Sequence, residues 1–107
     1  MGKPINITDA NFQQEVLSSE KLAVLDLWAI WCGPCRLLDP IFNELYEDYK
    51  DKVIIGKVNV DENPNIPQKY SVLNIPTILF IKNGELVDKI VGAVPKRAIV
   101  EIIEKYL

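Results

Sequence analysis

The amino-acid sequence predicts an α/β protein in which helices cover both faces of a mixed β-sheet. Apolar runs typical of strands alternate with segments of helical periodicity through the first two thirds of the chain. Near the end, an Asn-Gly pair between two apolar runs predicts a β-hairpin. With 107 residues, 49% of them apolar, the chain has the length of one domain and enough material for one core. We therefore expect residues 1–107 to form a single domain.

The predicted order begins with a short strand at residues 4–6, followed by a helix. Thr8 is a good N-cap, and Asp9 after it suits the positive end of a helix. The predicted helix carries one apolar stripe, formed by Phe12, Val16 and Leu17.

The middle of the chain predicts two longer strands with a long helix between them. Residues 22–29 are strand formers with a single charge among them. From Pro34 to Tyr49 apolar residues fall at helical spacing, and Pro40 should kink the axis because proline removes one backbone hydrogen bond. Residues 53–60 are almost continuously apolar, which is typical of a strand covered on both faces. Strands joined through helices in this way are expected to be parallel, with right-handed crossovers.

The last third predicts a short helix, the hairpin and a final helix. Turn signals precede a short helix that starts near Asn63 and Pro64. The sequence "KNGE" joins two antiparallel strands of the same sheet, and Lys82 and Glu85 should face each other as a small favourable pair. Pro95 starts the last helix. Its expected buried stripe consists of Ile99, Ile102, Ile103 and Tyr106.

The composition argues against several classes of function. A net charge of −3 and scattered Lys and Arg residues do not favour a nucleic-acid-binding surface. The first ten residues lack the apolar centre of a signal peptide, and no apolar run approaches the ~20 residues of a membrane span. We therefore expect a cytoplasmic protein with neither nucleic acid nor membrane as a partner. The chain has no histidine, which removes the commonest general base and the commonest transition-metal ligand.

The only two cysteines, Cys32 and Cys35, enclose Gly33 and Pro34 at the junction of the 22–29 strand and the long helix. Pro34 suits a first helical turn, where its missing N–H costs nothing. Because the N–H groups of a helix start stabilise an anion, we expect a lowered pKa for Cys32, which makes it nucleophilic near neutral pH. Cys35 lies on the same helical face, within disulfide reach. It is the predicted resolving thiol, which attacks the mixed disulfide between Cys32 and a substrate.

Other uses of two close cysteines are less favoured. A zinc site needs about four ligands, so only a metal shared between chains or completed by carboxylates would fit, and we expect no metal. A structural disulfide that closes so short a loop gains little chain entropy. A cysteine protease would need a histidine. A C-x-x-C pair at a strand–helix junction instead favours redox chemistry.

The sequence "WAIWCGPCR", followed in order by "IPT", "KNGE" and "VGA", resembles the thioredoxin family over essentially the whole chain. The resemblance implies a three-layer fold with a five-stranded mixed sheet, strand order 1-3-2-4-5, flanked by four helices. It also implies a general protein-disulfide reductase with no bound cofactor, because the cysteine pair carries the reducing equivalents. The implied partners are protein disulfide substrates and a thioredoxin reductase that recycles the pair. We expect a monomer.

Asp26 is unusual in the middle of a predicted strand, because aspartate is disfavoured in strands and rarely buried. Burial would raise its pKa, and a carboxyl poised near neutrality can take the proton from Cys35 and return it later. The alternative is a carboxylate satisfied by Lys57 in the next strand, and both can hold together. The family's buried aspartate matches Asp26, which favours proton transfer.

Pro76 matches a cis-proline that faces the disulfide in the family. This leaves the backbone of Ile75 free to pair with an extended substrate segment, as in strand addition. A shallow apolar collar around Cys32 is then expected from Trp31, Gly33, Pro34, Ile75, Pro76, Gly92 and Ala93. Trp31 has the alternative of an ordinary surface aromatic, and Gly92 that of a plain turn glycine.

Two alternative functions stay open at this stage. One is another redox role on the same fold, as an oxidant or an isomerase. The other is an interaction module that uses its thiols for structure or for a metal between subunits. The Gly-Pro dipeptide between the cysteines resembles the reductases.

Overall fold

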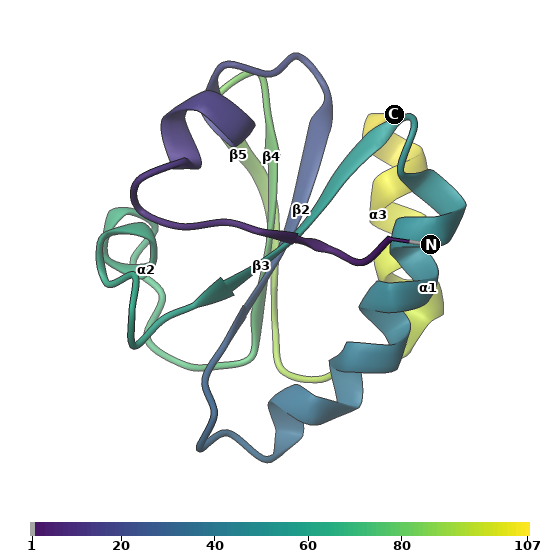
Figure 1. Ribbon diagram of the computed structural model, residues 1–107. Helices are drawn as coiled ribbons and strands as arrows, with labels where there is room; N and C mark the ends of the chain where they lie inside the picture. The colour runs from purple at the N-terminus through teal and green to yellow at the C-terminus, as the bar shows by residue number, and fades with distance from the viewer. Residues whose placement is uncertain (1) are drawn as a thin grey trace.

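The computed structural model describes residues 2–107, which form five strands of one sheet with helices on both faces (Figure 1). The strands are β1 (Ile5–Asn6), β2 (Leu22–Trp28), β3 (Val53–Asn59), β4 (Thr77–Lys82) and β5 (Glu85–Val91). The helical segments are η1 (Gln13–Leu17), η2 (Pro34–Leu38), α1 (Asp39–Tyr49), α2 (Asn65–Lys69) and α3 (Lys96–Tyr106). The predicted fold class is confirmed.

The sheet has the order β1-β3-β2-β4-β5, which confirms the order implied by the family resemblance. β3 runs parallel to both β1 and β2, and β4 is antiparallel to β2 and β5. β2 has a hydrogen-bonded neighbour on each side and helices on each face, so every residue of β2 except Trp28 is buried. The strand that leads to the cysteines is therefore the most enclosed element of the sheet.

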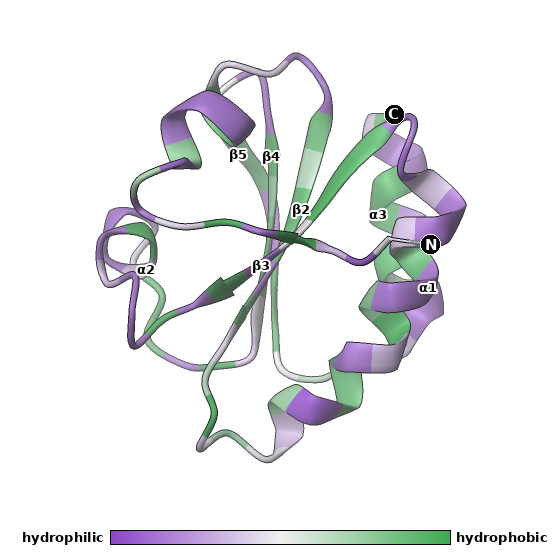
Figure 2. Ribbon diagram, in the orientation of Figure 1, coloured by the Kyte–Doolittle hydropathy of each residue, from purple (hydrophilic) through white to green (hydrophobic). Residues whose placement is uncertain are grey.

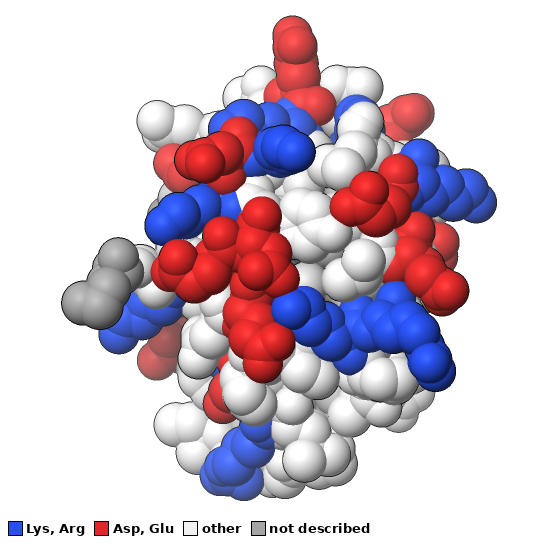
Figure 3. All heavy atoms as spheres, turned by 90° about the vertical axis from the view of Figure 1, so that its right-hand side faces the viewer, with Lys and Arg blue, Asp and Glu red and all other residues white. Residues whose placement is uncertain are grey.

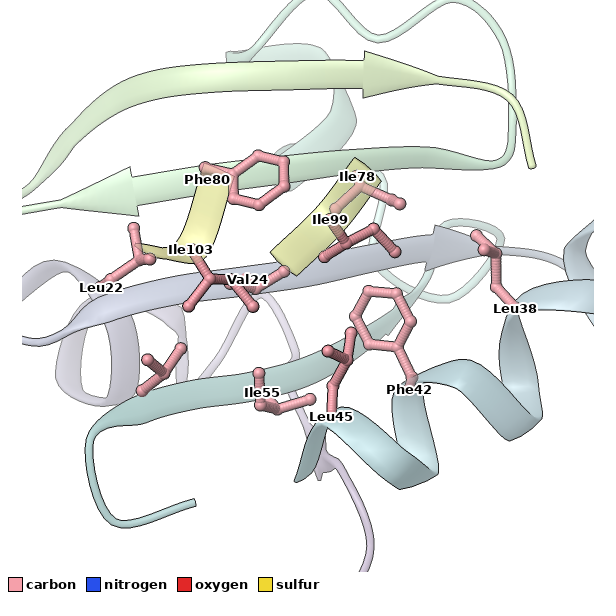
Figure 4. Packing of buried hydrophobic residues seen from close by; sticks show 11 residues of the cluster. Leu22, Val24, Leu38, Phe42, Leu45, Ile55, Ile78, Phe80, Ile99 and Ile103 are labelled. Atoms are coloured by element: carbon pink, nitrogen blue, oxygen red, sulfur yellow. The ribbon is translucent and has the colours of Figure 1, made fainter. Parts of the chain in front are cut away.

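The helices α1 and α3 cover one face of the sheet (Figure 1). Figure 2 shows the hydrophobic colouring concentrated along the strands, with hydrophilic residues on the outer sides of these helices. In Figure 4, Phe42 of α1 and Ile99 of α3 point toward the side chains of the sheet. The buried core on this face consists of Leu22, Val24, Leu38, Phe42, Leu45, Val53, Ile55, Ile78, Phe80, Ile99 and Ile103.

The opposite face is covered by η1 and α2 (Figure 1). Alternate residues of β2 point to this side, because side chains of a strand alternate between the two faces of a sheet. The buried core here consists of Ile7, Phe12, Val16, Ala23, Leu25, Leu27, Val58, Ile66, Leu79 and Ile81. All of these side chains are apolar.

The first helix begins later than predicted. Thr8 and Asn11 hydrogen bond to each other reciprocally, with the Thr8 N–H 2.8 Å from Asn11 Oδ1 and the Asn11 N–H 3.1 Å from Thr8 Oγ1. The short polar side chains hold a turn at this point, and η1 starts only at Gln13, with Phe12 as its N-cap. Thr8 therefore caps the turn that precedes the helix.

Asp9 serves a different helix from the one predicted. Its carboxylate oxygens accept the N–H groups of Asn65 and Ile66, at 3.1 and 3.2 Å, at the start of α2. These N–H groups have no partner within α2, because the first N–H groups of a helix point out of its end. Asp9 thus ties α2 to the loop between β1 and η1.

The long predicted helix is divided at Pro40. The segment η2 is a 3₁₀-helix, and α1 starts at Asp39. Pro40 has no N–H to donate to the Arg36 carbonyl oxygen four residues earlier, and the Asp39 N–H donates to it instead. The irregularity expected at Pro40 takes the form of this change of helix type.

The hairpin is confirmed. Asn83 and Gly84 have φ angles of +52° and +79°, as a two-residue turn between twisted strands requires. Lys82 and Glu85 occupy opposed positions, as predicted, but among the described residues their side chains form no salt bridge. Lys82 Nζ instead donates to the carbonyl oxygen of Tyr106 at 2.7 Å, which fixes the end of α3 against the sheet.

Acidic and basic side chains are intermixed on the surface shown in Figure 3. Between α3 and α1, Lys96 bridges Glu44 at 3.1 Å and Asp48 at 2.8 Å. Among the described residues, no helix combines the length and the apolar character needed to cross a membrane.

Candidate active site

Cys32 and Cys35 form a disulfide where the loop after β2 enters η2, and their Cα atoms are 5.4 Å apart. Gly33 and Pro34 place Cys35 in the first turn of η2. The backbone N–H of Cys35 donates to Cys32 Sγ, with 3.3 Å between nitrogen and sulfur. When the disulfide is reduced, a donor at this position stabilises negative charge on the Cys32 sulfur.

Both cysteines are largely buried, with exposed fractions of 4% for Cys32 and 3% for Cys35. They form a small cluster with Ala29, against which Trp28, Val60 and Ile75 pack. Little of the disulfide therefore meets solvent.

The Ile75–Pro76 peptide bond is cis, as the family resemblance implied. Pro76 is buried, and its carbonyl oxygen accepts the Gly92 N–H at 2.8 Å. This hydrogen bond places the residues after β5 beside the start of β4. Ile75 is half-buried against the cysteine cluster, so the structure brings the predicted Ile75 and Pro76 to the site.

A groove of about 530 Å³ opens next to the cysteine cluster. Trp31 and Ile75 are the predicted collar residues that line it. Trp31 is 68% exposed, and its Nε1–H donates to Asp61 Oδ2 at 2.9 Å, so the indole is held in place while its surface stays free. Leu73, which also lines the groove, is 91% exposed.

The sequence reasoning missed most of this groove. Its other lining residues are Val60, Pro64, Pro67, Gln68, Val72, Leu73 and Asn74. The available signal was the pair Val72 and Leu73, two apolar residues in a turn-rich segment where no strand or helix was expected to bury them.

The remaining collar residues lie outside the lining of this groove. Gly33, Pro34 and Ala93 are exposed, and Gly92 is half-buried. Gly92 has a φ of +102°, and a Cβ atom there would meet nothing within 4 Å. The backbone conformation by itself thus requires glycine at this position, which is the reason that the alternative of a plain turn glycine would give.

Asp26 lies on β2, two residues before the end of the strand, and is fully buried. Within the described part of the chain, neither of its carboxylate oxygens has a hydrogen-bond partner. Burial raises the pKa of Asp26 from 3.8 to about 7; the charge of Lys57 opposes this rise and that of Asp39 adds to it. A carboxyl with this pKa exchanges its proton near neutral pH.

Lys57 is the neighbour of Asp26 on β3 in the sheet register, but its side chain does not bond to Asp26. Lys57 Nζ pairs instead with Asp39 Oδ1 at 2.5 Å and lies 5.2 Å from the centre of the Trp28 ring. The half-exposed Asp39 keeps part of its hydration, whereas an ion pair with Asp26 would require both charges to be desolvated. The direct Lys57–Asp26 contact considered from the sequence is therefore absent.

A second cavity, of about 160 Å³, adjoins this region. Its walls include Cys35, Lys57 and Asp39. A volume of this size has room for several water molecules. The cavity places the resolving cysteine and the Lys57–Asp39 pair around one space.

A cysteine pair at a strand–helix junction, beside an open groove and above a buried carboxyl, defines an oxidoreductase that works by dithiol–disulfide exchange. The family model described as "Thioredoxin" matches residues 3–105. The chain belongs to the thioredoxin family. In this family the cysteine pair is itself the redox centre, and no cofactor is required.

Two relatives extend over the same length as this chain. "Thioredoxin" of Chlorobaculum thiosulfatiphilum is 50% identical over 106 residues, which cover 99% of this chain and 98% of the relative. "Thioredoxin 1" of Nostoc sp. is 43% identical over 107 residues, which cover both chains completely. "Thioredoxin M-type, chloroplastic" of Spinacia oleracea is 45% identical over 102 residues, 95% of this chain and 56% of the relative.

Over residues 2–107, no group of three or more His, Cys, Asp or Glu side chains is arranged to hold a metal ion.

Proposed function

We propose that this protein is a general protein-disulfide reductase, in which Cys32 attacks, Cys35 resolves and Asp26 handles the proton. The observation that carries the proposal is the Cys35 N–H, which donates to Cys32 Sγ at 3.3 Å beside an open groove. This arrangement favours Cys32 as the sulfur that carries negative charge and meets the target.

In the first step, the Cys32 thiolate attacks one sulfur of the target disulfide. The sulfur–sulfur bond of the target breaks, a mixed disulfide with Cys32 forms, and the other target sulfur leaves as a thiolate that takes up a proton. The helix-start position of the pair supports this role for Cys32, because backbone N–H groups stabilise the attacking anion.

In the second step, Cys35 gives its proton to the Asp26 carboxylate and attacks Cys32 Sγ. The bond to the target breaks, and the second target sulfur is released and protonated. Two electrons and two protons pass from the cysteine pair to the target. The complete burial of Asp26 and its pKa of about 7 support this role, since such a carboxylate accepts a proton near neutral pH.

The groove and the cis Ile75–Pro76 bond would hold the target. An extended segment of the target pairs with the backbone of Ile75, and its apolar side chains contact Trp31. The exposed positions near the disulfide would complete the contact surface: Gly33, Pro34, Gly92 and Ala93. As a supporting residue, Lys57 moderates the rise of the Asp26 pKa through its positive charge.

A thioredoxin reductase would return the disulfide to the dithiol, and the protein would act as a monomer in the cytoplasm. The similarity to "Thioredoxin" and "Thioredoxin 1" of two bacteria, over at least 98% of each chain, supports this assignment. The spinach relative, of which this chain covers 56%, is the chloroplastic form.

The equilibrium reduction potential of the Cys32–Cys35 pair tests the direction of the reaction. The pair is equilibrated in defined redox buffers, and its dithiol fraction is measured by alkylation and mass spectrometry. A potential well below that of the glutathione pool is expected, and each ~30 mV corresponds to about 1.4 kcal/mol of preference. A potential well above that pool would indicate an oxidant or an isomerase. Inert thiols would contradict a redox function.

A further inference from the structure

Two carboxylates compete for one lysine beneath the active loop. Asp26 on β2 and Lys57 on β3 are register neighbours whose side chains point to the same face of the sheet. Asp39, at the start of α1, covers that face from above and forms an ion pair with Lys57. The result is a buried carboxyl with no hydrogen-bond partner among the described residues, next to a lysine that is engaged elsewhere.

We propose that Asp39 is a positioning residue for the exchange reaction, which holds Lys57 away from Asp26 and so keeps Asp26 able to accept a proton near neutral pH. The inference rests on the proposed function only in taking Asp26 as the acceptor of the Cys35 proton. The control of Asp26 by Asp39 is a property of the resting protein.

The geometry gives Lys57 two fixed contacts and leaves one alternative. Lys57 Nζ is 2.5 Å from Asp39 Oδ1, and it lies 5.2 Å from the centre of the Trp28 ring. Without the Asp39 carboxylate, the neighbouring acceptor on the same face is Asp26. A lysine side chain has a flexible four-carbon stem, so its ammonium group can turn toward the remaining carboxylate, that of Asp26.

The charges that act on Asp26 come from two elements. Lys57 on β3 lowers its pKa, and Asp39 on α1 raises it, while burial is the largest influence. On β4, the residue opposite Asp26 is the apolar Ile78. The helix α3 contributes buried isoleucines to this face, and its Lys96 is bound by α1 carboxylates at the surface. Arg36 lines the neighbouring cavity, where its guanidinium donates to the Ile30 carbonyl oxygen at 2.9 Å.

The consequence for the reaction follows from the strength of the acceptor. If Lys57 turned to Asp26, the carboxylate would be stabilised and would hold a proton less well. The resolving step would then lose a base that is matched to neutral pH. Asp39 acts here through Lys57 and through its own negative charge, and both effects have the same sign.

The test is an NMR titration of the Asp26 side-chain carboxyl carbon in the oxidised protein, where no turnover occurs. In Asp39→Asn we expect the pKa of Asp26 to fall by about one unit or more, because a cation is released toward it and an anion is removed. Glu44→Gln is the matched control: it also removes one carboxylate from α1 that pairs with a lysine, but on the Lys96 side. The control should leave the titration of Asp26 unchanged.

A second background separates positioning from the direct effect of charge. In Lys57→Met the same Asp39→Asn change should move the pKa of Asp26 by less than half of the shift seen with Lys57 present. An equal shift in both backgrounds would overturn the positioning role, and so would a shift in Asp39→Asn no larger than in Glu44→Gln.

The pH profile of single-turnover reduction gives a readout of function. The half-maximal pH should fall in Asp39→Asn together with the Asp26 titration. If the titration moves and the rate profile does not, the positioning by Asp39 stands and the proton-transfer role of Asp26 fails. If neither moves, the inference about Asp39 is wrong.

Discussion

The two faces of β2 carry different kinds of side chain. Ala23, Leu25 and Leu27 point toward η1 and α2, where every buried member of the cluster is apolar. On the opposite face the strand begins with equally apolar residues and then places Asp26 at full burial, beneath α1. One strand therefore supplies an ordinary core on one side and a titratable group on the other.

Under the proposed mechanism, the face that carries Asp26 gives up stability for chemistry. A buried carboxyl without a hydrogen-bond partner costs free energy, which an aliphatic residue at position 26 would avoid. The cost falls on the same face of the sheet as Lys57, which lines a cavity together with Cys35 and Asp39. The opposite face contacts the cysteine cluster through the apolar side chains of Val60 and Ile75.

The largest effect is expected from Cys35→Ser. Without the resolving thiol, Cys32 can form the mixed disulfide with a target but cannot release it, so turnover should fall by about a thousandfold or more. The trapped adduct can be measured by mass spectrometry under non-reducing conditions. In Cys32→Ser neither turnover nor adduct is expected, and an adduct on Cys35 in that variant would contradict the assignment of the nucleophile.

Asp26→Asn should remove the pH-dependent free-energy cost of burying the carboxyl. The pKa of Asp26 is about 7 in the folded protein and 3.8 without burial, so the folded state holds the proton more tightly. The stability that this proton provides is present at low pH and is lost as the pH rises from about 4 to about 7. Asparagine stays neutral, so the variant should gain about 4 kcal/mol over the parent across this window.

Urea denaturation of both proteins at about pH 4 and about pH 8 measures this gain. The two proteins should be close in stability at the lower pH and well separated at the higher one. A constant difference at both values would mean that the carboxyl of Asp26 does not titrate as described.

Leu25→Ala sharpens the comparison from the apolar face. The side chain is fully buried, and its removal leaves a cavity, so we expect a loss of about 3 kcal/mol in the free energy of unfolding. The pH dependence of turnover should keep its shape, because this face contacts the cysteine cluster through the apolar Val60 and Ile75 and the substitution removes no titratable group. Leu86→Ala, a partly exposed position on β5, serves as a control with a small loss. A displaced pH profile in Leu25→Ala would show that the two faces are coupled.

The smallest effect is expected in the groove, from Leu73→Ser. Leu73 is 91% exposed, so the substitution should leave stability unchanged. Contact with a target in the groove would be weakened, and KM for an unfolded disulfide-containing protein should rise about fivefold with kcat unchanged. Leu86→Ser is the control for loss of an apolar surface residue outside the groove. Equal KM values for the two variants would exclude Leu73 from target binding.

Much of this fold was predictable because its signals are local or tied to one motif. The apolar run of β2, the turn at Asn83 and Gly84, and the cysteine pair at the helix start each depend on a few adjacent residues. The sheet order and the cis Ile75–Pro76 bond came from the family resemblance, and the structure confirms both.

The features that escaped prediction depend on contacts between distant parts of the chain. Asp9 was expected to serve the helix next to it, but it caps α2, 56 residues away. Lys57 was considered as a partner of Asp26 because it lies in the next buried strand, but its ammonium group pairs with Asp39 of α1. A sequence pattern shows which side chains can pair, whereas the choice between two carboxylates depends on their relative hydration in the folded protein.

The most direct test of the account is the pH dependence of single-turnover target reduction in the parent protein and in Asp26→Asn. The fluorescence of the two tryptophans, Trp28 and Trp31, beside the cysteines reports the reaction in a stopped-flow experiment. With saturating target, the parent rate should rise with a midpoint near the Asp26 pKa of about 7. In Asp26→Asn the rate at neutral pH should fall by about tenfold or more, and its midpoint should move to more alkaline pH. Superimposable profiles from about pH 6 to about pH 9 would contradict the central claim that Asp26 accepts the proton of Cys35.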